Sequence, residues 1–475
     1  MTEKKKIRVC ERGWEYAQIT DNDGSVEICS WASMHFPRIG KLTEQSMRDI
    51  WHGEKATEFR KSFLDGSYRY CEKEKCPWMA NGTLEEHMRE YDGVLDYPTA
   101  LSISYDKSCN YACRCCADNG SGIKHPPCPA DKQAKIDAEI GKFIDNVRVI
   151  SANGRGELFA GKHILQTLAG WKPKRPAEEI YVVLETNGSM FDEKHWEQIA
   201  NLGQYNLKVS ITVMSFEQAA YSYLSGSKLP VQKIVDNLHF VSKLREQGVI
   251  NDFEIGTVIQ ERNFREMPEF TRRCIEDFKV DRVRLRPYFP FGNVMSAAEK
   301  WLFDVRNPYH PYNVEYVDML KDPIFQHPKA MLWSGDEVSQ VGRFPGEKDK
   351  ENFEVIRYFA VDDGLPQKLA GYFSERGITA VSVHGLSYAG HAFVKALQKT
   401  CVRVDKLIDK AKCGKIDKEH CMNIVSPSDL PIDYALPIVV TAPFFFEEIK
   451  TELEQNLDNP MILNIKDIIN EIETC

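Results

Sequence analysis

The sequence predicts an α/β protein in three parts, and three observations lead to this prediction. Between about residue 98 and residue 290, six apolar stretches alternate with amphipathic helices, which indicates a parallel sheet, either open or curled into a partial barrel. A loop-rich segment with four cysteines precedes them, and a second strand–helix alternation begins near residue 350. We therefore expect a small Cys-rich domain over residues 1–95, the sheet and a connecting segment over 96–345, and a small doubly wound α/β domain over 346–475.

The composition and net charge of the chain reduce the number of function classes to consider. Of the 475 residues, 43% are hydrophobic, and the net charge of −9 without a basic stripe argues against a nucleic-acid binder. The chain begins without an apolar signal-peptide core, and the longest apolar run, residues 435–446, is too short to span a bilayer. We therefore expect a soluble, cytoplasmic protein with no nucleic-acid or membrane partner, and the possibility of a homo-oligomer stays open.

The front part is expected to fold around a metal centre. Residues 19–29 predict a β-hairpin around Asp23-Gly24, and residues 42–66 predict one or two helices that end at Gly66. Fourteen cysteines in a reducing cytoplasm are not expected to form disulfides. Metal binding is the usual reason for grouped cysteines, and the front part holds Cys10, Cys29, Cys71 and Cys76.

The middle part supplies the parallel sheet. Its strand candidates are residues 100–105, 147–152, 180–185, 207–213, 253–260 and 282–287. One intervening helix is expected to share a face among Ile136, Ile140, Phe143 and Ile144, and another is closed by Gly248. The stretch CNYACRCC, residues 109–116, directly follows the first strand. It therefore lies at the carboxyl edge of the sheet, where chemistry gathers in such folds.

The last part resembles a dinucleotide-binding unit in one short stretch. The residues HGLSYAG follow a strand and place Gly385 and Gly390 as a fingerprint would, but Ser387 replaces the middle glycine and would crowd a pyrophosphate. Asp405 and Asp409, near the next strand, are candidates to meet a ribose. We expect a domain that mainly docks substrate or another subunit, with nucleotide binding as the alternative. Nearby Cys413, His420 and Cys421 are expected to be scattered surface residues rather than a metal site.

The cysteine-rich stretch at residues 109–116 has the spacing of a cluster ligand set. Cys109, Cys113 and Cys116 form C-x3-C-x2-C. Three thiolates on one loop can ligate three irons of a [4Fe–4S] cluster and leave the fourth iron open to a cofactor. The alternative is a zinc knuckle that takes its fourth ligand from Cys115 or Cys128.

These motifs together resemble the radical S-adenosylmethionine (radical SAM) enzymes over most of the chain. The resemblance rests on five stretches, each after an expected strand: LSISYDKSCNYACRCC, ISANGRGELFA, VLETNGSMF, VSITVMSFEQAAYSYLSG and IGTVIQERNFREMPEF. It implies a partial (β/α)6 TIM-like barrel, followed here by a Rossmann-like α/β domain.

The resemblance also implies roles for individual residues. Cys109, Cys113 and Cys116 would hold a [4Fe–4S] cluster, whose open iron binds the amino and carboxylate groups of S-adenosylmethionine. The backbone near Gly156 and Glu157 would receive the methionine amine.

Four further residues are candidates for contacts with the cofactor or substrate. Asn187 and Ser210, at strand ends, would face the cofactor's carboxylate or ribose, or else be a turn residue and a capping hydroxyl. Arg284 and Arg286 alternate with apolar neighbours, so both point to one face, where they would bind a carboxylate or form structural salt bridges. In the family the residue before the last cluster cysteine is usually aromatic, and here it is Cys115.

The front part resembles the SPASM domain of the same superfamily, which holds an auxiliary [4Fe–4S] cluster. In the family this domain usually follows the core, whereas here it precedes it. Four cysteines suffice for full ligation, so the resemblance implies an electron relay or a structural clamp, with a structural zinc site as the alternative.

The family implies one-electron cleavage of S-adenosylmethionine to a 5′-deoxyadenosyl radical, which abstracts a substrate hydrogen, with flavodoxin or ferredoxin as electron donor. Oxidation would use the auxiliary cluster, and epimerisation a hydrogen-donating thiol, for which Cys115 and Cys128 are candidates. The C-terminal part favours a carbohydrate or sugar-linked small molecule as substrate, with a peptide as the alternative. A non-catalytic metal-binding scaffold is a remote third hypothesis.

Overall fold

The computed structural model describes residues 7–30, 38–71, 73, 76–116, 129–152, 155–288, 297–332, 346–361 and 364–474. Contacts divide the chain into two compact units. Unit 1 comprises residues 1–257, 269–285 and 326–331, and unit 2 comprises residues 258–268, 286–325 and 332–475. The three-domain division at residues 95 and 345 stays a prediction, and its first domain shares unit 1 with most of the second.

The front of unit 1 is a small, loop-rich assembly of short elements. Its strands are β1 (Ile7–Cys10), β2 (Tyr16–Thr20), β3 (Ser25–Glu27), β4 (Gly40–Lys41) and β5 (Met88–Tyr91). Its helices are α1 (Arg12–Glu15), α2 (Met47–His52), α3 (Glu54–Leu64), α4 (Pro77–Ala80) and the 3-10 turn η1 (Leu84–His87). The predicted hairpin is present, because β2 and β3 pair antiparallel around Gly24, whose φ of 64° suits glycine. The two predicted helices are α2 and α3, and Gly66 follows them with φ 70°.

The large sheet runs in the order β12-β11-β10-β9-β8-β7-β6-β2-β3-β4. Its further strands are β6 (Ala100–Ser104), β7 (Val149–Ala152), β8 (Tyr181–Thr186), β9 (Asn206–Thr212), β10 (Asp252–Ile259), β11 (Arg282–Pro287) and β12 (Ala330–Leu332). Strands β6 to β10 pair parallel in sequence order, as predicted for the middle part. Strand β2 joins the same sheet parallel to β6, with Tyr16 opposite Ala100, so the front assembly extends the core sheet.

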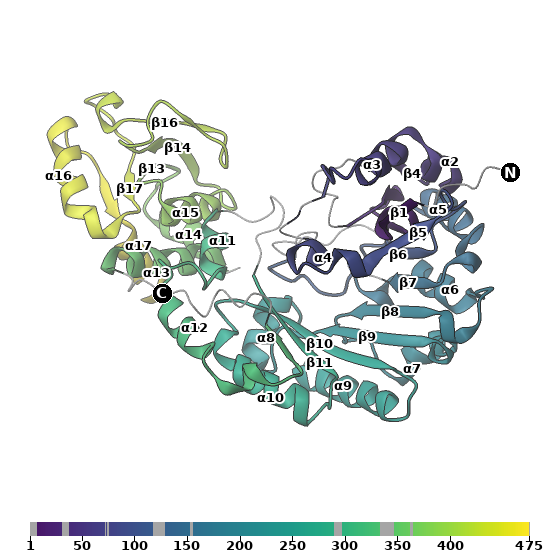
Figure 1. Ribbon diagram of the computed structural model, residues 1–475. Helices are drawn as coiled ribbons and strands as arrows, with labels where there is room; N and C mark the ends of the chain where they lie inside the picture. The colour runs from purple at the N-terminus through teal and green to yellow at the C-terminus, as the bar shows by residue number, and fades with distance from the viewer. Residues whose placement is uncertain are drawn as a thin grey trace. The chain divides into compact units, whose positions relative to one another are not determined.

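Helices lie along the outer side of these strands in unit 1 (Figure 1). They are α5 (Ala130–Gly141), α6 (Lys162–Gly170), α7 (Glu193–Trp196), α9 (Val231–Glu246) and α10 (Met267–Glu276), with α8 (Gln218–Ser225) and the 3-10 turns η3 (Ile144–Asn146), η4 (Leu158–Ala160), η5 (Ala177–Glu179), η6 (Glu197–Gln204) and η7 (Phe264–Glu266) between strands. The helix predicted to include Phe143 and Ile144 ends earlier, at Gly141, although both side chains are still buried. Gly248 follows α9 with φ 76°, as expected of a residue that ends a helix.

Unit 2 contains a second, smaller sheet in the order β15-β16-β14-β13-β17-β18. Its strands are β13 (Ala380–His384), β14 (Arg403–Ile408), β15 (Ile416–Asp417), β16 (Met422–Val425), β17 (Ile438–Val440) and β18 (Ile462–Asn464). Its helices are α11 (Ala297–Phe303), α12 (Asn313–Met319), α13 (Glu347–Val361), α14 (Leu365–Glu375), α15 (Tyr388–Leu397), α16 (Phe446–Asn456) and α17 (Ile465–Thr474), with 3-10 turns η8 (Pro323–Gln326), η10 (Pro427–Asp429) and η11 (Pro443–Phe445). All pairs except β15–β16 are parallel, which is the doubly wound arrangement predicted for the last part.

In the described part of the chain, every helix is too short or too polar to traverse a lipid bilayer.

Candidate functional site

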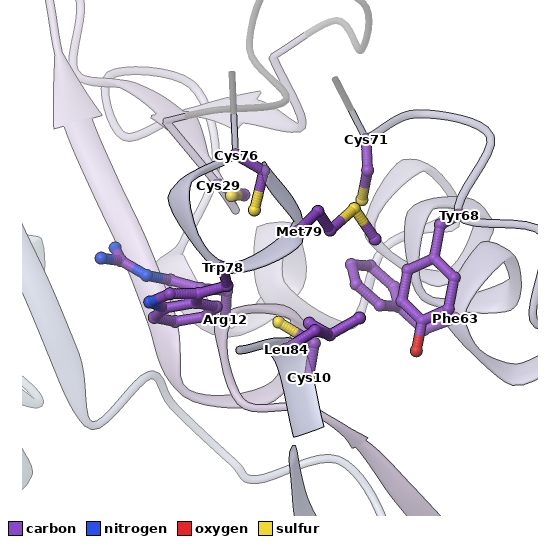
Figure 2. A pocket seen from close by; sticks show the side chains of 10 residues that line it. All are labelled: Cys10, Arg12, Cys29, Phe63, Tyr68, Cys71, Cys76, Trp78, Met79 and Leu84. Atoms are coloured by element: carbon purple, nitrogen blue, oxygen red, sulfur yellow. The ribbon is translucent and has the colours of Figure 1, made fainter. Parts of the chain in front are cut away.

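The four front cysteines line one pocket. Cys10 ends β1, Cys29 follows β3, and Cys71 and Cys76 lie between α3 and α4. Figure 2 shows their sulfur atoms around the same space, although the four residues come from three separate parts of the front assembly. The sequence predicted this grouping, and the fold provides it.

The walls of this pocket are mainly apolar and aromatic. They are formed by Phe63, Tyr68, Trp78, Met79 and Leu84, with Arg12 as the charged member. The guanidinium of Arg12 lies 4.1 Å from the ring centre of Tyr16 and 5.4 Å from that of Trp78. A cation held beside four thiolates favours a negatively charged iron–sulfur cluster.

Burial makes two of these thiols weak acids. It raises the pKa of Cys10 to about 12, and the nearby thiols of Cys29 and Cys76 raise it further against the Arg12 backbone N–H. The pKa of Cys71 is likewise raised to about 12 by burial and by its three cysteine neighbours. Because metals bind thiolates, a bound cation would favour the ionised form of both groups.

Four cysteines around one pocket can ligate a [4Fe–4S] cluster or a structural zinc ion, and the pocket they line suits either centre.

The second cysteine group lies on the loop after β6, at the carboxyl edge of the sheet. Asp106 accepts a hydrogen bond from the Ser108 N–H at 2.9 Å, and the Cys116 N–H donates to the Cys113 carbonyl at 3.1 Å. The Tyr111 N–H points to the Cys109 sulfur at 3.4 Å. The loop is therefore wound on itself, and Cys109, Cys113 and Cys116 are brought together.

The end of α8 holds this loop from the other side. The N–H groups of Ala112 and Arg114 donate to the carbonyls of Ser225 and Leu224 at 2.9 and 3.0 Å. Gly226 follows with φ 63°, and a Cβ there would lie 2.7 Å from the Ala112 carbonyl oxygen. The fourth β-α unit thus fixes the backbone on which the three cysteines lie.

Gly156 and Glu157 pack directly against the start of the same loop. The Glu157 N–H donates to the Ser108 carbonyl at 2.8 Å, and a Cβ on Gly156 would lie 2.6 Å from the Asp106 carbonyl oxygen. The Glu157 carboxylate is fully buried and accepts from Thr186 Oγ1 at 2.6 Å and from the Asn187 N–H at 2.7 Å. Burial raises the pKa of Glu157 despite these bonds.

Asn187 extends this network to the first cluster cysteine. Its Nδ2 donates to Asn110 Oδ1 at 2.9 Å and lies 4.0 Å from the Cys109 sulfur, within reach of a weak hydrogen bond to sulfur. Its Oδ1 accepts from Ser189. Asn187 is therefore more than a turn residue, because it links the Gly156-Glu157 turn to the cysteine loop.

Two of the three predicted ligands have thiol pKa values above the ordinary cysteine value. Burial raises the pKa of Cys109 to about 11, with Glu157 and Cys116 acting in the same direction against the Tyr111 N–H. Burial also raises the pKa of Cys113, and the neighbouring Cys115, Cys116 and Cys109 add to the effect. Cys115 is close enough to Cys113 to raise its pKa, and its role as a hydrogen donor stays a prediction, whereas Cys128 lies outside the described residues.

Ser210 and Arg284 meet a residue that the sequence reading did not single out. Glu254, 2% exposed, accepts from Ser210 Oγ at 3.0 Å and pairs with Arg284 at 2.8 Å. Lys208 and Arg282 also lie within 2.9 and 3.2 Å of its carboxylate. For Arg284 these contacts favour the salt-bridge alternative, and its role toward a cofactor stays a prediction.

Arg286 lies on the same face of β11 as Arg284, as the alternation predicted. Val283, before Arg284, and Leu285, between the two arginines, are buried on the other face. Its role, like that of Ser210, stays a prediction.

Replacing Glu254 with glutamine should destabilise unit 1 by about 3 kcal/mol, because three cations would lose their buried counter-charge. Urea unfolding of the reconstituted protein measures the change. Glu246→Gln is the matched control, since Glu246 pairs with Lys279 at an exposed site and should cost under about 1 kcal/mol. Equal effects of both substitutions would contradict a structural role for Glu254.

In unit 2, side chains of the protein itself form hydrogen bonds at the loop that resembles a dinucleotide-binding fingerprint. A Cβ on Gly390 would lie 2.0 Å from the Gly385 carbonyl oxygen, so helix α15 packs as closely as the fingerprint requires. However, Asp409 accepts from the Leu386 N–H at 3.0 Å, and Asp405 binds Arg403 and Tyr434. A carboxylate at the loop opposes an anionic pyrophosphate, so the nucleotide-binding alternative gains no support.

Two groups of functional candidates were missed from sequence. Glu254 faces Ser210 only because β10 and β9 pair in that register, which a single-chain pattern does not reveal. His391 was not singled out as the partner of His420, because their contact depends on how α15 meets the β15–β16 hairpin. An acidic residue inside an otherwise apolar strand was the available signal for Glu254.

Comparison with known proteins identifies the front assembly. Residues 10–77 match SPASM, an iron–sulfur cluster-binding domain, and this range includes all four front cysteines. The match confirms the predicted SPASM-type domain ahead of the sheet and an iron–sulfur cofactor there. That Cys10, Cys29, Cys71 and Cys76 are its ligands stays a prediction. A search of curated proteins found no match.

Several solved structures share remote similarity with the chain. SuiB from Streptococcus suis is 15% identical with a TM-score of 0.33, over 70% of each chain. SuiB bound to the precursor peptide SuiA gives the same identity and TM-score over 73% of this chain and 74% of that one. TsrM, a radical S-adenosylmethionine methyltransferase from Kitasatospora setae with cobalamin and a [4Fe–4S] cluster, is 15% identical with a TM-score of 0.30, over 42% and 40%.

Proposed function

We propose that the protein is a radical SAM enzyme with an auxiliary iron–sulfur centre, which cleaves S-adenosylmethionine reductively and abstracts a hydrogen from a substrate C–H bond. One observation carries the proposal: the C-x3-C-x2-C loop follows the first parallel strand and rests on the Gly156-Glu157 turn. We also propose that strands β6 to β11 form the partial (β/α)6 barrel, for which the sequential strand order is support.

The first centre would be held by Cys109, Cys113 and Cys116. The raised pKa values of Cys109 and Cys113, and the influence of Cys116 on both, fit a polycation that ionises neighbouring thiols. When bound, a [4Fe–4S] cluster with S-adenosylmethionine at its open iron supplies the electron for carbon–sulfur cleavage and the hydrogen-abstracting chemistry. The chain's own task is to keep the loop fixed and shielded from water.

Neighbouring residues divide this task. Gly156 lets two backbone segments approach closely, and the buried Glu157 carboxylate locks the next turn, at Asn187, beside the Cys109 sulfur. We assign Gly156, Glu157 and Asn187 to positioning of the loop and of the cofactor's amino-acid end. Ser210 and the two arginines of β11 are proposed contacts for its ribose or carboxylate groups.

The front pocket would hold the auxiliary [4Fe–4S] cluster with all four cysteines as ligands. Full ligation leaves no iron open for a substrate, which supports an electron relay or a structural clamp. Apolar walls of Phe63 and Leu84 limit water there, and solvent exposure is one factor that sets cluster potential. A cellular reductant such as flavodoxin or ferredoxin would supply the electrons.

Two routes are available for the next step of the substrate radical, and each depends on a different group of this protein. Electron transfer to the auxiliary centre would make the reaction an oxidation, and hydrogen donation by a thiol would make it an epimerisation. Cys115 supports the second route, because it is half-buried beside Cys113.

The doubly wound unit favours a sugar-linked substrate, but its Asp405 and Asp409 already bind groups of the protein itself, which removes part of that support. A peptide is the alternative.

Formation of 5′-deoxyadenosine tests the proposal. The reconstituted protein, reduced and given S-adenosylmethionine, should release 5′-deoxyadenosine and methionine, and Cys113→Ala should lower the yield by about 100-fold or more, because the cluster needs all three ligands. Cys115→Ala is the matched control, since it removes the adjacent thiol without touching the set. No product from the wild type would favour the non-catalytic scaffold, and equal losses in both variants would contradict the ligand assignment.

A further inference from the structure

Two histidines of unit 2 face one another across separate elements. His391 lies on α15, and His420 lies in the turn between β15 and β16. Nδ1 of His391 and Nε2 of His420 are 3.1 Å apart, and the ring centres are 5.2 Å apart at an interplanar angle of 22°. Both side chains are largely buried, with His420 8% exposed, so these nitrogens meet in a sheltered place.

A carboxylate completes a set of three ligand atoms. Oε2 of Glu419 lies 3.8 Å from Nδ1 of His391, and all three ligand atoms lie within 4.8 Å of one another. In a tetrahedral zinc site with bonds of about 2.0 Å, neighbouring ligand atoms are about 3.3 Å apart. The observed separations of 3.1 and 3.8 Å bracket that value. The third pair, Nε2 of His420 and Oε2 of Glu419, lies within 4.8 Å, and the exposed Glu419 side chain can move to close that gap.

The outer nitrogen of each ring also has a polar neighbour. Oδ2 of Asp417 lies 3.8 Å from Nε2 of His391, and its other oxygen accepts a hydrogen bond from the His420 backbone N–H at 2.8 Å. The side-chain amide of Gln398 lies 3.2 Å from Nδ1 of His420. Metal-binding histidines usually direct their second nitrogen to such a carboxylate or amide, which fixes the ring and its tautomer.

We propose that His391, His420 and Glu419 bind a divalent cation of the zinc class, oriented by Asp417 and Gln398. This site is separate from both cysteine centres and from the proposed function. Two imidazoles and a carboxylate suit zinc, whereas magnesium and calcium prefer all-oxygen sites. The three ligands leave one position of a tetrahedral ion for water.

The cation would join α15 to the β15–β16 hairpin, whose strand β16 pairs with β14. It would thereby fix the start of the helix that follows the dinucleotide-like loop. The sequence expectation of scattered residues here holds for the two cysteines: Cys413 and Cys421 are exposed, and their sulfurs point to the carbonyls of Lys410 and Lys418. It is wrong for His420, which is buried and has His391 as its partner.

Zinc binding to the full chain tests the proposal. The protein is first reconstituted with iron and sulfide so that the cysteine centres are filled, then equilibrated with ZnCl2 and dialysed, and zinc and iron are measured per chain. Wild type should retain about one zinc. His391→Ala/His420→Ala should retain none, and Glu419→Gln should bind zinc at least about tenfold more weakly.

Three controls make the result specific. Cys413→Ser/Cys421→Ser and His163→Ala should keep the zinc, since His163 pairs with Asp137 in unit 1 without a second histidine. Iron content and 5′-deoxyadenosine formation should be unchanged in every variant, so failure of this proposal is distinguishable from failure of the proposed function. Glu419→Gln changes an exposed side chain and keeps the test valid if the double variant does not fold. Absence of zinc from wild type, or zinc retained by the double variant, would overturn the proposal.

Discussion

Replacing Cys109, Cys113 and Cys116 with alanine together should lower bound iron from about eight atoms per chain to about four after anaerobic reconstitution. The front pocket is built from other elements and would keep its own cluster, because its four cysteines lie on β1 and on loops before β6. Iron and sulfide analysis measures the change, and sulfide should fall in parallel. The reciprocal variant, without the four front cysteines, should also retain about four irons.

Cys115→Ala is the control for this experiment, and it should keep all the iron. About four irons in wild type that fall to none in the triple variant would contradict the auxiliary cluster and would make the front assembly a zinc or empty module. Any electron relay through the front centre would then have to be abandoned.

Gly156→Ala should remove the first cluster while leaving the second. A Cβ at this position would lie 2.6 and 2.8 Å from the carbonyl oxygens of Asp106 and Ser108, and backbone cannot yield as a flexible side chain does. Overpacking of this kind costs about 1–3 kcal/mol, and here the shift would fall on the residues just before Cys109. We expect iron near four atoms per chain and a loss of 5′-deoxyadenosine formation of about 100-fold or more, as for Cys113→Ala, because the same cluster is missing.

Gly141→Ala is the matched control, because nothing lies within 4 Å of a Cβ there. It sits at the end of α5, where alanine is tolerated or slightly stabilising. Full cluster loading in Gly156→Ala would show that the loop can move aside and that the close packing does not position it.

Strands were the most predictable part of the fold. Apolar runs such as residues 207–213 and 253–260 correspond to β9 and β10 within a residue or two, since burial on both faces leaves a continuous apolar signal. The helix expected to include Phe143 ended sooner, because buried side chains after a helix continue its apolar pattern without its backbone. Pairing of β2 with β6 had no local signal, since it joins distant segments.

In the candidate sites too, some features could be predicted from the sequence and others could not. A set of cysteine ligands on one loop can be predicted from the sequence, because the sequence itself gives the spacing of the ligands, as for Cys109 to Cys116. Contacts that need tertiary register, such as Glu254 with Arg284 or His391 with His420, arise only when separate elements meet. The sequence predicted Asn187 as a residue at the end of a strand, but it did not predict that its side chain approaches the Cys109 sulfur.

The parallel pairing of β2 with β6 bears on synthesis of the chain at the ribosome. Tyr16–Thr20 emerges first, whereas its partner Ala100–Ser104 follows roughly ten seconds later at typical elongation rates. During that interval β2 has only the hairpin strand β3 beside it and presents an open edge to other nascent chains. The front cysteines are translated in the same interval, so their ligand set is complete before strands β6 to β12 of the sheet exist. Maturation of the two centres would then be ordered in time, with the auxiliary one first.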